Sequence, residues 1–346
     1  MKSLATHCSI LYLLLNSLAG AAFGFSIKNH ANLIPASTES LVSTQIGSAS
    51  ATTETRRQSL VKLISTVSTV GIYTAFPSPT FALEDATNNS NKRVAIIGGS
   101  GRTGMSVAET IASDAYKMNG MIMTRSGKDP FQIVKLPPST KERLSLYPGS
   151  VDVRDANGVF QALKESSPNY VVYAASASKQ GGNSFDVDDV GVENVALACK
   201  EIGARLILIS ALAVDRPQSK SFQITNTIGG YMDKIMDAKL NGETKCKQIL
   251  GKNYVIIRPG VLLSGKSKGG ASDIELNQGD LIGGGLGRDE LAGIVAGAIE
   301  SNVSGVTVEA YRIKTRTKLQ PEFPMTSGNE LTASTYTGLF ANANSD

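Results

Sequence analysis

Residues 94–104 read VAIIGGSGRTG, an apolar run followed by a glycine-rich turn. We expect the apolar run to form a buried strand and the residues after the turn to begin a helix. In a unit of this kind Gly98 permits the tight turn, Gly101 lets the backbone approach a diphosphate, and Gly104 allows the helix to pack closely on the strand. The stretch therefore predicts the first βαβ unit of a dinucleotide-binding domain.

The same turn supplies groups that would hold the phosphates. A helix starting near Arg102 or Thr103 directs its unpaired amide hydrogens and the positive end of its dipole toward them. Arg102 adds a positive charge, and Ser100 lies in the same loop. We therefore place Ser100, Arg102 and Thr103 with the three glycines among the predicted cofactor-binding residues.

The second expected strand decides which nicotinamide coenzyme fits. NAD-dependent proteins place an acid at the end of this strand, where it accepts hydrogen bonds from ribose hydroxyls. Here the strand is followed by Arg125. An arginine pairs with a 2′-phosphate and an acid would repel it, so the sequence favours NADP(H), with NAD(H) as the second choice. The other interpretation is that Arg125 is an ordinary solvated surface residue.

From residue 92 onward, short apolar runs alternate with amphipathic stretches, the pattern of βαβ units. The predicted fold class is α/β, a Rossmann-like doubly wound parallel sheet with helices on both faces. The expected strands are Val94–Ile97, Met121–Thr124, Ser150–Asp152, Tyr170–Ala174, Leu206–Ser210, Tyr254–Ile257 and Val306–Glu309. The expected helices are Thr103–Tyr116, Ala156–Glu165, Asp188–Glu201, Tyr231–Leu250 and Asp289–Glu300. Stretches 176–187, 211–230 and 263–287 lack a clear period and are expected to be irregular, the first two on the substrate side.

Residues 83–312 are predicted to form this domain, and residues 313–346 a polar C-terminal tail. The hydrophobic period disappears after Tyr311, so we expect the tail to be loose. Leu339 and Phe340 could pack locally or touch a protein partner.

The composition excludes several classes of site. With 41% hydrophobic and 18% charged residues, the 346-residue chain resembles an ordinary globular protein. Residues 1–82 contain five basic and two acidic residues and so carry a net charge of +3. The remaining residues carry only +1 of the total +4. The expected domain therefore lacks the positive charge that nucleic-acid binding requires. Both histidines also lie in residues 1–82, and the two later cysteines form no C-x-x-C pair. No histidine-based triad and no metal site are therefore predicted.

The N-terminal 82 residues are typical of a targeting leader. Residues 1–22 combine an early positive charge, an apolar run and small residues, as in a secretory signal peptide, and the run is short for a membrane anchor. Residues 23–82 are predicted to be a plastid transit region, rich in Ser and Thr at first. Arg56 and Arg57 precede the apolar stretch 63–76, which resembles a twin-arginine signal for the thylakoid lumen. A membrane-surface helix or the end of a stromal transit peptide are the alternatives. We expect a plastid location, in stroma or lumen, and no stable membrane span in the mature protein.

The loop GGSGRTG and the matches that follow it resemble the atypical, or divergent, short-chain dehydrogenase/reductases, the NmrA-like and NAD(P)H-binding group. The similarity runs over most of residues 92–310. It implies that Asp152 and Val153 lie at the adenine, and that Ala174 and Ala175 pass under the cofactor ribose. Asp188, with Gly191 and Asn194, resembles the start of the helix before the fifth strand, although Asp188 could also simply cap that helix.

The resemblance also implies candidate catalytic residues. Ser210 matches the family's serine, Lys239 with Glu243 its helix lysine and glutamate, and Pro259 the family's R-P-G turn at the cofactor. Each has a plainer interpretation; Glu243, for example, could pair with Lys239 on one helix face.

One departure from the family concerns the proton donor. In catalytic members a tyrosine four residues before the lysine donates a proton to a carbonyl, because the lysine cation lowers its pKa. Here that position is Ile235. Tyr231 and Lys234 would face each other on the same helix and could replace the family's tyrosine–lysine pair. We interpret them instead as an ordinary surface pair. Lys239 is then expected to hold the nicotinamide ribose, or simply to stabilise the helix, rather than to perform acid–base chemistry.

Three functions remain open on the sequence. The first is an NADP(H)-dependent oxidoreductase acting on an unknown small molecule, whose acceptor takes its proton from solvent. The second is a cofactor-binding protein without turnover, a redox sensor or an assembly scaffold. The third, epimerase or dehydratase chemistry, needs the same missing tyrosine and ranks below both.

Overall fold

A computed structural model describes residues 89–346 except 131, 132, 266, 268 and 321–327. The predicted signal peptide (residues 1–22) and transit region (residues 23–82) lie outside the described residues. Within the described part of the chain, no helix combines the length and the apolar character that crossing a bilayer requires.

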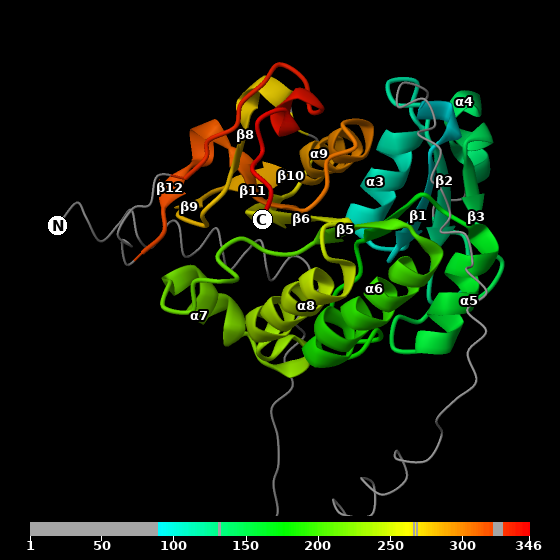
Figure 1. Cartoon of the computed structure of the whole chain (residues 1–346), viewed down its shortest axis with the longest axis horizontal. Helices are drawn as coiled ribbons and strands as arrows, with labels where there is room; N and C mark the ends of the chain where they lie inside the picture. The colour runs from blue at the N-terminus through cyan, green and yellow to red at the C-terminus, as the bar shows by residue number, and fades with distance from the viewer. Residues whose placement is uncertain (1–88, 131–132, 266, 268, 321–327) are drawn as a thin grey trace, which may run out of the picture. The chain divides into compact units, whose positions relative to one another are not determined.

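An eight-stranded sheet forms the centre of the domain, in the order β3-β2-β1-β4-β5-β6-β11-β8 (Figure 1). All neighbouring pairs run parallel except β11 and β8, which are antiparallel. The chain starts in the middle at β1, winds outward to β3, and then returns to build the other half from β4. This confirms the doubly wound α/β sheet predicted from the sequence. The strands are β1 (Arg93–Ile97), β2 (Asn119–Met123), β3 (Leu144–Leu146), β4 (Tyr170–Tyr173), β5 (Arg205–Ile209), β6 (Tyr254–Pro259), β8 (Ile274–Asn277) and β11 (Val306–Arg312).

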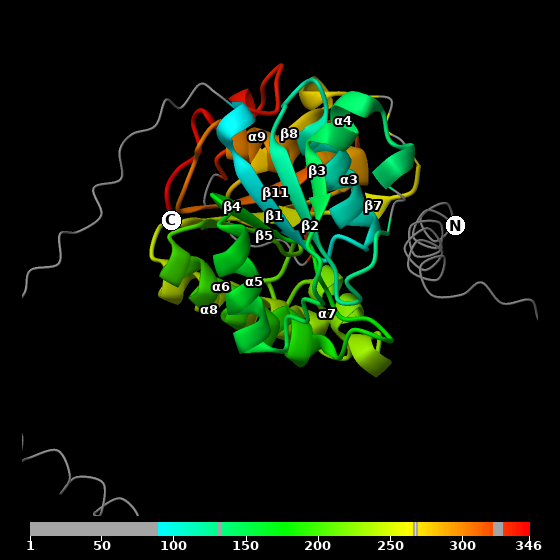
Figure 2. The same cartoon turned by 90° about the vertical axis from the view of Figure 1, so that its right-hand side faces the viewer.

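Helices cover both faces of the sheet (Figures 1 and 2). On one face lie α3 (Arg102–Ala112) and α9 (Arg288–Glu300), and on the other α5 (Ala156–Ser166), α6 (Gly191–Ile202) and α8 (Ile235–Leu250). The smaller elements are the helices α4 (Pro138–Glu142) and α7 (Lys220–Asn226), and the short strands β7 (Val261–Leu263), β9 (Ile282–Gly283), β10 (Gly285–Gly287) and β12 (Thr317–Lys318).

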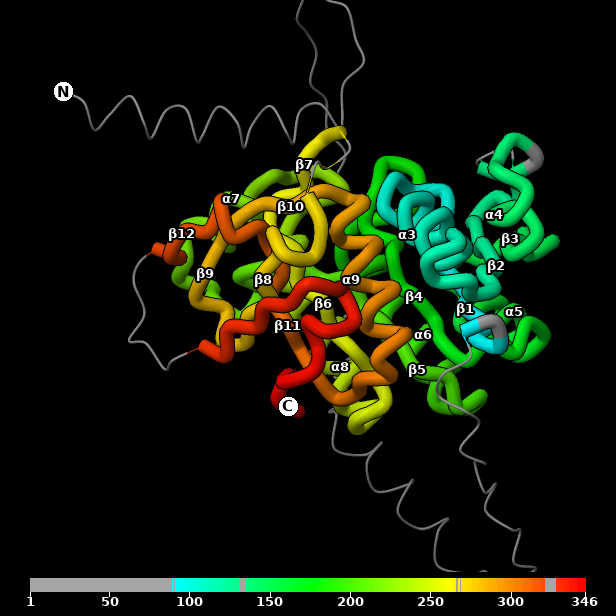
Figure 3. The backbone as a smooth tube through the Cα atoms, turned by 90° about the horizontal axis from the view of Figure 1, so that it is seen from above, coloured from blue at the N-terminus to red at the C-terminus, as the bar shows by residue number. Residues whose placement is uncertain are grey.

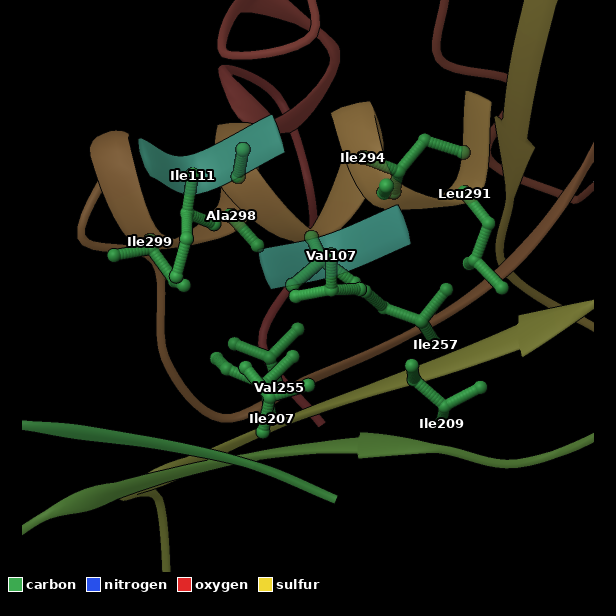
Figure 4. Packing of buried hydrophobic residues seen from close by; sticks show 14 of the residues in the cluster. Val107, Ile111, Ile207, Ile209, Val255, Ile257, Leu291, Ile294, Ala298 and Ile299 are labelled. Atoms are coloured by element: carbon green, nitrogen blue, oxygen red, sulfur yellow. The ribbon is translucent and has the colours of Figure 1, made fainter. Parts of the chain in front are cut away.

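The alternation of β1 divides the core into two clusters. Val94 and Ile96 point into the cluster under α3 and α9, whereas Ala95 and Ile97 point into the cluster under α5 and α6. Figure 4 shows the first cluster, where side chains of α3 and α9 pack on those of β5 and β6. Each such buried aliphatic side chain contributes roughly 1.5–3 kcal/mol.

The third strand is not where the sequence predicted it. Ser150–Asp152 is not a strand; β3 is Leu144–Leu146, which pairs with residues 120–122 of β2. The run is only three residues long with a serine at its centre, so it gives no continuous apolar signal. The predicted irregular stretch 263–287 is also wrong in part, because it contains β8, which pairs with β11 at the edge of the sheet.

The starts of two helices also differ from the prediction. The helix expected from Tyr231 begins at Ile235, because its N-cap Lys234 has a positive φ of 52° and separates it from a short turn, Gly230–Met232. Tyr231 and Lys234 therefore do not share a helix face. A π-helical turn, Phe185–Val190, precedes α6. Asp155 is the N-cap residue of α5, and its carboxylate accepts no capping hydrogen bond.

The end of the C-terminal tail is packed on the domain, contrary to the expectation of a loose segment. Leu339 and Phe340 are 1% and 4% exposed and join the core cluster under α9. The Asp346 carboxylate accepts hydrogen bonds from the Thr307 hydroxyl at 2.5 Å and from the Tyr254 hydroxyl at 2.9 Å. Of the two expectations for Leu339 and Phe340, the structure shows packing within the chain.

Candidate functional site

The glycine loop joins β1 to α3 and lies against the end of β4. Gly98 has φ +79°, and a Cβ atom there would lie 2.5 Å from the backbone nitrogen of Ala175. A Cβ at Gly104 would collide with the carbonyl oxygen of Gly98. Both positions therefore require glycine, one for the turn and the neighbouring strand, the other for the close approach of helix to loop.

Gly101 differs from the other two glycines because its surroundings are open. A Cβ there would meet one described atom within 4 Å, the carbonyl oxygen of Gly98 at 3.2 Å. Gly101 is also the N-cap of α3, whose first intrahelical bond runs from the amide of Met105. The amides of Arg102, Thr103 and Gly104 precede that bond and are oriented for an anion outside the helix. Ser100 and Arg102 are exposed, and Thr103 is half-buried.

Arg125 follows β2 at the same edge of the sheet. Its carbonyl oxygen accepts a hydrogen bond from the Ser150 hydroxyl at 2.5 Å, which fixes the backbone of the turn. The guanidinium lies near Gly181, in the loop after β4. No hydrogen bond or ion pair engages this guanidinium within the described residues.

Asp152 and Val153 follow Ser150 and Val151, which hydrogen-bond to the backbone carbonyls of Arg125 and Thr124. The Asp152 carboxylate is bound by Arg154, with Nε at 2.9 Å and Nη2 at 2.5 Å from its two oxygens. These hydrogen bonds, and more weakly the charge of Arg125, hold the pKa of Asp152 below its usual value. Val153 is buried, and its carbonyl accepts a hydrogen bond from Asn194 at 2.9 Å. Sequence reasoning missed Arg154, which the turn after Asp152 folds back onto it.

Ala174 and Ala175 continue β4 underneath the glycine loop. The amide of Ala174 donates to the carbonyl of Ile97 at 2.9 Å, so β4 and β1 stay paired up to the loop. Both residues are half-buried.

Lys239 forms a buried ion pair that its sequence neighbours did not predict. Its ammonium group lies 2.7 Å from the carboxylate of Asp188, and Glu243 does not contact it. The other bonds of Asp188 come from the Ser176 hydroxyl and the Ala177 amide, both at 2.8 Å. Asp188 therefore links α8 to the loop after β4 instead of capping α6.

Ile235, in the position of the family's tyrosine, does not face this ion pair. It is 2% exposed and packs in a small cluster with Val214, Phe222 and Met236. A phenol could not replace it without displacing that cluster. The described structure thus offers no side chain at this position that can exchange a proton.

Ser210 lies directly after β5 and faces the same small pocket as Lys239. Its hydroxyl oxygen is buried and has no hydrogen-bond partner within the described residues. The pocket's free volume, about 10 Å³, is at the threshold for a single water molecule. Its lining consists of Tyr173, Asp188, Val192, Leu208, Ile209, Ser210 and Lys239.

Comparison with known proteins decides the family. A family profile described as NAD(P)H-binding matches residues 98–302, which contain the glycine loop, Arg125 and Lys239. The chain belongs to this NAD(P)H-binding family. No curated protein sequence matches it significantly.

Solved structures resemble this member of the NAD(P)H-binding family at low identity. An oxidoreductase of Lactococcus lactis is 16% identical, with a TM-score of 0.48, covering 64% of this chain and 92% of that one. A Rossmann-fold NAD(P)-binding family protein of Shigella flexneri is 18% identical, with a TM-score of 0.46, covering 68% and 99%. A short-chain dehydrogenase/reductase of Veillonella parvula in complex with NADP is 14% identical, with a TM-score of 0.47, covering 65% and 96%.

The residues of this family member fit a nicotinamide dinucleotide. The open backbone at Gly101 and the first-turn amides of α3 suit a diphosphate, and the unpaired hydroxyl of Ser210 lies farther along the same edge of the sheet. Pro259 is buried at the end of β6, and its carbonyl accepts a hydrogen bond from the Leu212 amide at 3.0 Å.

Next to Pro259, Arg258 is the centre of a buried charge cluster. Its guanidinium contacts Glu243 at 2.7 Å and Glu309 at 3.3 Å, and Asp280 lies 3.8 Å away. Asp215, at the rim, is 3.0 Å away. Asp215, Asp280 and Glu309 come from loops and strands far apart in the sequence, so no local spacing could have predicted the cluster.

Proposed function

We propose that this protein binds NADP(H) at the carboxyl edge of its sheet and transfers a hydride between that coenzyme and a small organic acceptor in a plastid. The glycine loop is the observation that carries the proposal. Gly98 and Gly104 leave no space for a side chain, whereas Gly101 is open toward solvent beside the unpaired amides of α3. That combination suits a ligand that brings phosphate oxygens close to the backbone.

The surroundings of Arg125 support NADP(H) over NAD(H). Its guanidinium has no partner within the described residues, so it can bind a 2′-phosphate without first breaking an ion pair. The nearby acid, Asp152, is already bound by both nitrogen atoms of Arg154 that face it. The repulsion that a free carboxylate would exert on a 2′-phosphate is thereby reduced.

For the reaction, the chain offers positioning groups. The bound coenzyme would supply the hydride. Lys239 would donate hydrogen bonds to the nicotinamide ribose, held in place by Asp188 at 2.7 Å. Ser210 has a free buried hydroxyl that can form one further hydrogen bond. With Ile235 in place of a tyrosine, the acceptor would take its proton from solvent.

A second function, NADPH binding without turnover, is favoured by the burial of Ile235 and by the pairing of Lys239 with Asp188. A redox sensor or an assembly scaffold in the photosynthetic compartment would need the coenzyme site but no proton donor. The two functions are separated by assaying the full chain for NADPH binding through coenzyme fluorescence, and then for NADPH oxidation with flavin, quinone and carbonyl acceptors. Oxidation with any of them supports the oxidoreductase, and saturable binding without oxidation by all three classes supports the sensor or scaffold.

The Arg125→Ala variant tests the coenzyme preference. A charge-assisted hydrogen bond is worth about 1.5–3 kcal/mol, so the Kd for NADPH should rise by about tenfold or more while that for NADH changes little. Arg143→Ala is the matched control, because Arg143 loses the same charge but pairs with Asp114 away from the glycine loop. Equal losses for both coenzymes would contradict the 2′-phosphate role.

The plastid location rests on the composition of residues 1–82 alone. Mass spectrometry of the N-terminus of the protein from its native source tests it. A terminus near Leu83 supports the thylakoid lumen, and one at or shortly after Phe23 supports the stroma. An uncleaved Met1 would contradict both.

A further inference from the structure

Two arginines begin two neighbouring helices at the carboxyl edge of the sheet. Arg102 is the first residue of α3, and Arg288 is the first residue of α9. The helices pack side by side on the same face of the sheet (Figure 3). The hydroxyl of Ser106, one turn into α3, donates to the carbonyl of Arg288 at 3.2 Å, so the two helix starts lie next to each other.

Neither arginine has a carboxylate partner within the described residues. The acids that follow Arg288 are engaged elsewhere: Asp289 accepts from the amide and hydroxyl of Ser267 at 2.7 and 2.8 Å, and Glu290 accepts from Arg312. The Arg288 guanidinium donates to the carbonyl of Leu263 at 3.2 Å, and among the described residues its other donors bind no further acceptor.

The two guanidinium groups repel each other in the ligand-free chain. Burial, and then the positive charge of Arg102, lower the pKa of Arg288. The positive end of the α3 dipole adds to this charge, whereas the start of α9 is already capped by the carboxylates of Asp289 and Glu290, the latter accepting from the Gly287 amide at 2.7 Å. A ligand with two negative charges would relieve the repulsion, and the diphosphate bridge of a dinucleotide is such a group.

We propose that Arg288 is a second arginine ligand of the coenzyme's diphosphate, binding it from the α9 side while the glycine loop and Arg102 bind it from the α3 side. The inference rests on the proposed coenzyme site and adds a residue 184 positions beyond the end of the glycine loop. Asp289 and Ser267 are positioning residues in this arrangement, because their hydrogen bonds fix the first turn of α9. Since the diphosphate is common to both coenzymes, Arg288 should contribute equally to NADPH and NADH.

The test uses Arg288→Met in the full chain, since methionine keeps the apolar stem. The Kd values for NADPH and NADH should rise by the same factor, about tenfold. Inorganic pyrophosphate, measured by calorimetry, should bind the wild type saturably and the variant at least several-fold more weakly. Arg143→Ala again serves as the charge-matched control, expected to change neither ligand. If Arg288→Met does not fold, Arg288→Lys replaces it, which keeps the charge but loses the bidentate fork, with a smaller equal loss expected.

Each other outcome is decisive. Unchanged coenzyme affinity in the variant would overturn the role of Arg288 and leave the coenzyme site intact. A loss confined to NADPH would also overturn it, because it would assign Arg288 to the 2′-phosphate. Failure of the wild type to bind either coenzyme would instead sink the proposed function, and with it this inference.

Discussion

The charge cluster around Arg258 should make the stability of this protein depend on pH in an unusual direction. Three carboxylates in it are at most 2% exposed, those of Glu243, Asp280 and Glu309, and one guanidinium faces them. If all three were ionised, the buried cluster would carry a net charge of −2, which is costly in a low-dielectric interior. At least one of them should therefore keep its proton near neutral pH.

Glu309 is the group whose proton can be followed. Burial raises its pKa from 4.5 to about 7 against the opposing charge of Arg258. The folded chain thus holds this proton more tightly than the unfolded chain, so the stabilisation is complete below about pH 4 and is lost as the pH rises to about 7. A difference of about 2.5 pKa units corresponds to at most about 3 kcal/mol.

Other groups either reinforce this direction or act at lower pH. Burial raises the pKa of Asp280 well above its usual value, which has the same sign. The pKa values of Asp152, Asp289 and Asp346 are lowered, so the stability that these groups contribute is present above the unfolded-state pKa of about 3.9 and is lost as the pH falls below it. The interval from pH 5 to pH 8 therefore reports mainly on the cluster.

Urea unfolding of the wild type and of Glu309→Gln at pH 5 and pH 8 measures the effect. The wild type should lose stability between the two values, and the variant should lose up to about 3 kcal/mol less. Glu201→Gln, at an exposed glutamate, is the control and should keep the wild-type dependence. If Glu309→Gln shows the same dependence as the wild type, Glu309 is ionised in the folded protein at pH 5 and the charge argument is wrong.

Two further substitutions test the loop and the tail. Gly104→Ala gains about 1 kcal/mol of helix propensity but drives a Cβ into the carbonyl of Gly98, so we expect a net loss of about 1–3 kcal/mol in urea unfolding and weaker NADPH binding in the same preparation. A stable variant with wild-type affinity would show that the helix does not need to approach so closely. Phe340→Ala removes a side chain that is 4% exposed, so it should destabilise the domain by about 3 kcal/mol and speed proteolysis of the tail. A change in stability below about 0.5 kcal/mol would mean that the tail detaches without cost.

The parts of the fold that the sequence predicted are those with strong local signals. The apolar run of β1, the glycines after it and the amphipathic α3 are contiguous, so period and turn chemistry determine them together. The start of α8 depends instead on a distant residue. The Asn226 side chain accepts a hydrogen bond from the Met236 amide at 2.9 Å, across ten residues, and so caps the helix at a point that no local pattern marks.

The candidate site also has a part that the sequence predicts and a part that it does not. The residues around the diphosphate lie within one short motif and could be predicted from it, whereas the partners of the charged residues could not. Lys239 has a plausible partner four residues away in Glu243, but it binds Asp188, 51 residues earlier. Glu243 binds Arg258 because strand β6 carries that arginine toward α8. Only the three-dimensional arrangement of the turn before α6, of α8 and of β6 decides between these pairings.

The ion pair of Lys239 limits the chemistry that the proposed enzyme can perform. A lysine that assists a proton donor does so through an unpaired positive charge near a phenol, but here the buried carboxylate of Asp188 neutralises that charge at 2.7 Å and the phenol is replaced by Ile235. Reduction of a carbonyl requires a proton on the developing alkoxide during hydride transfer, since a free alkoxide is too basic to form near pH 7. Flavins and quinones form reduced anions that are far less basic, so they can be protonated later by solvent. If the protein oxidises NADPH, we therefore expect flavin or quinone acceptors to be turned over faster than carbonyls.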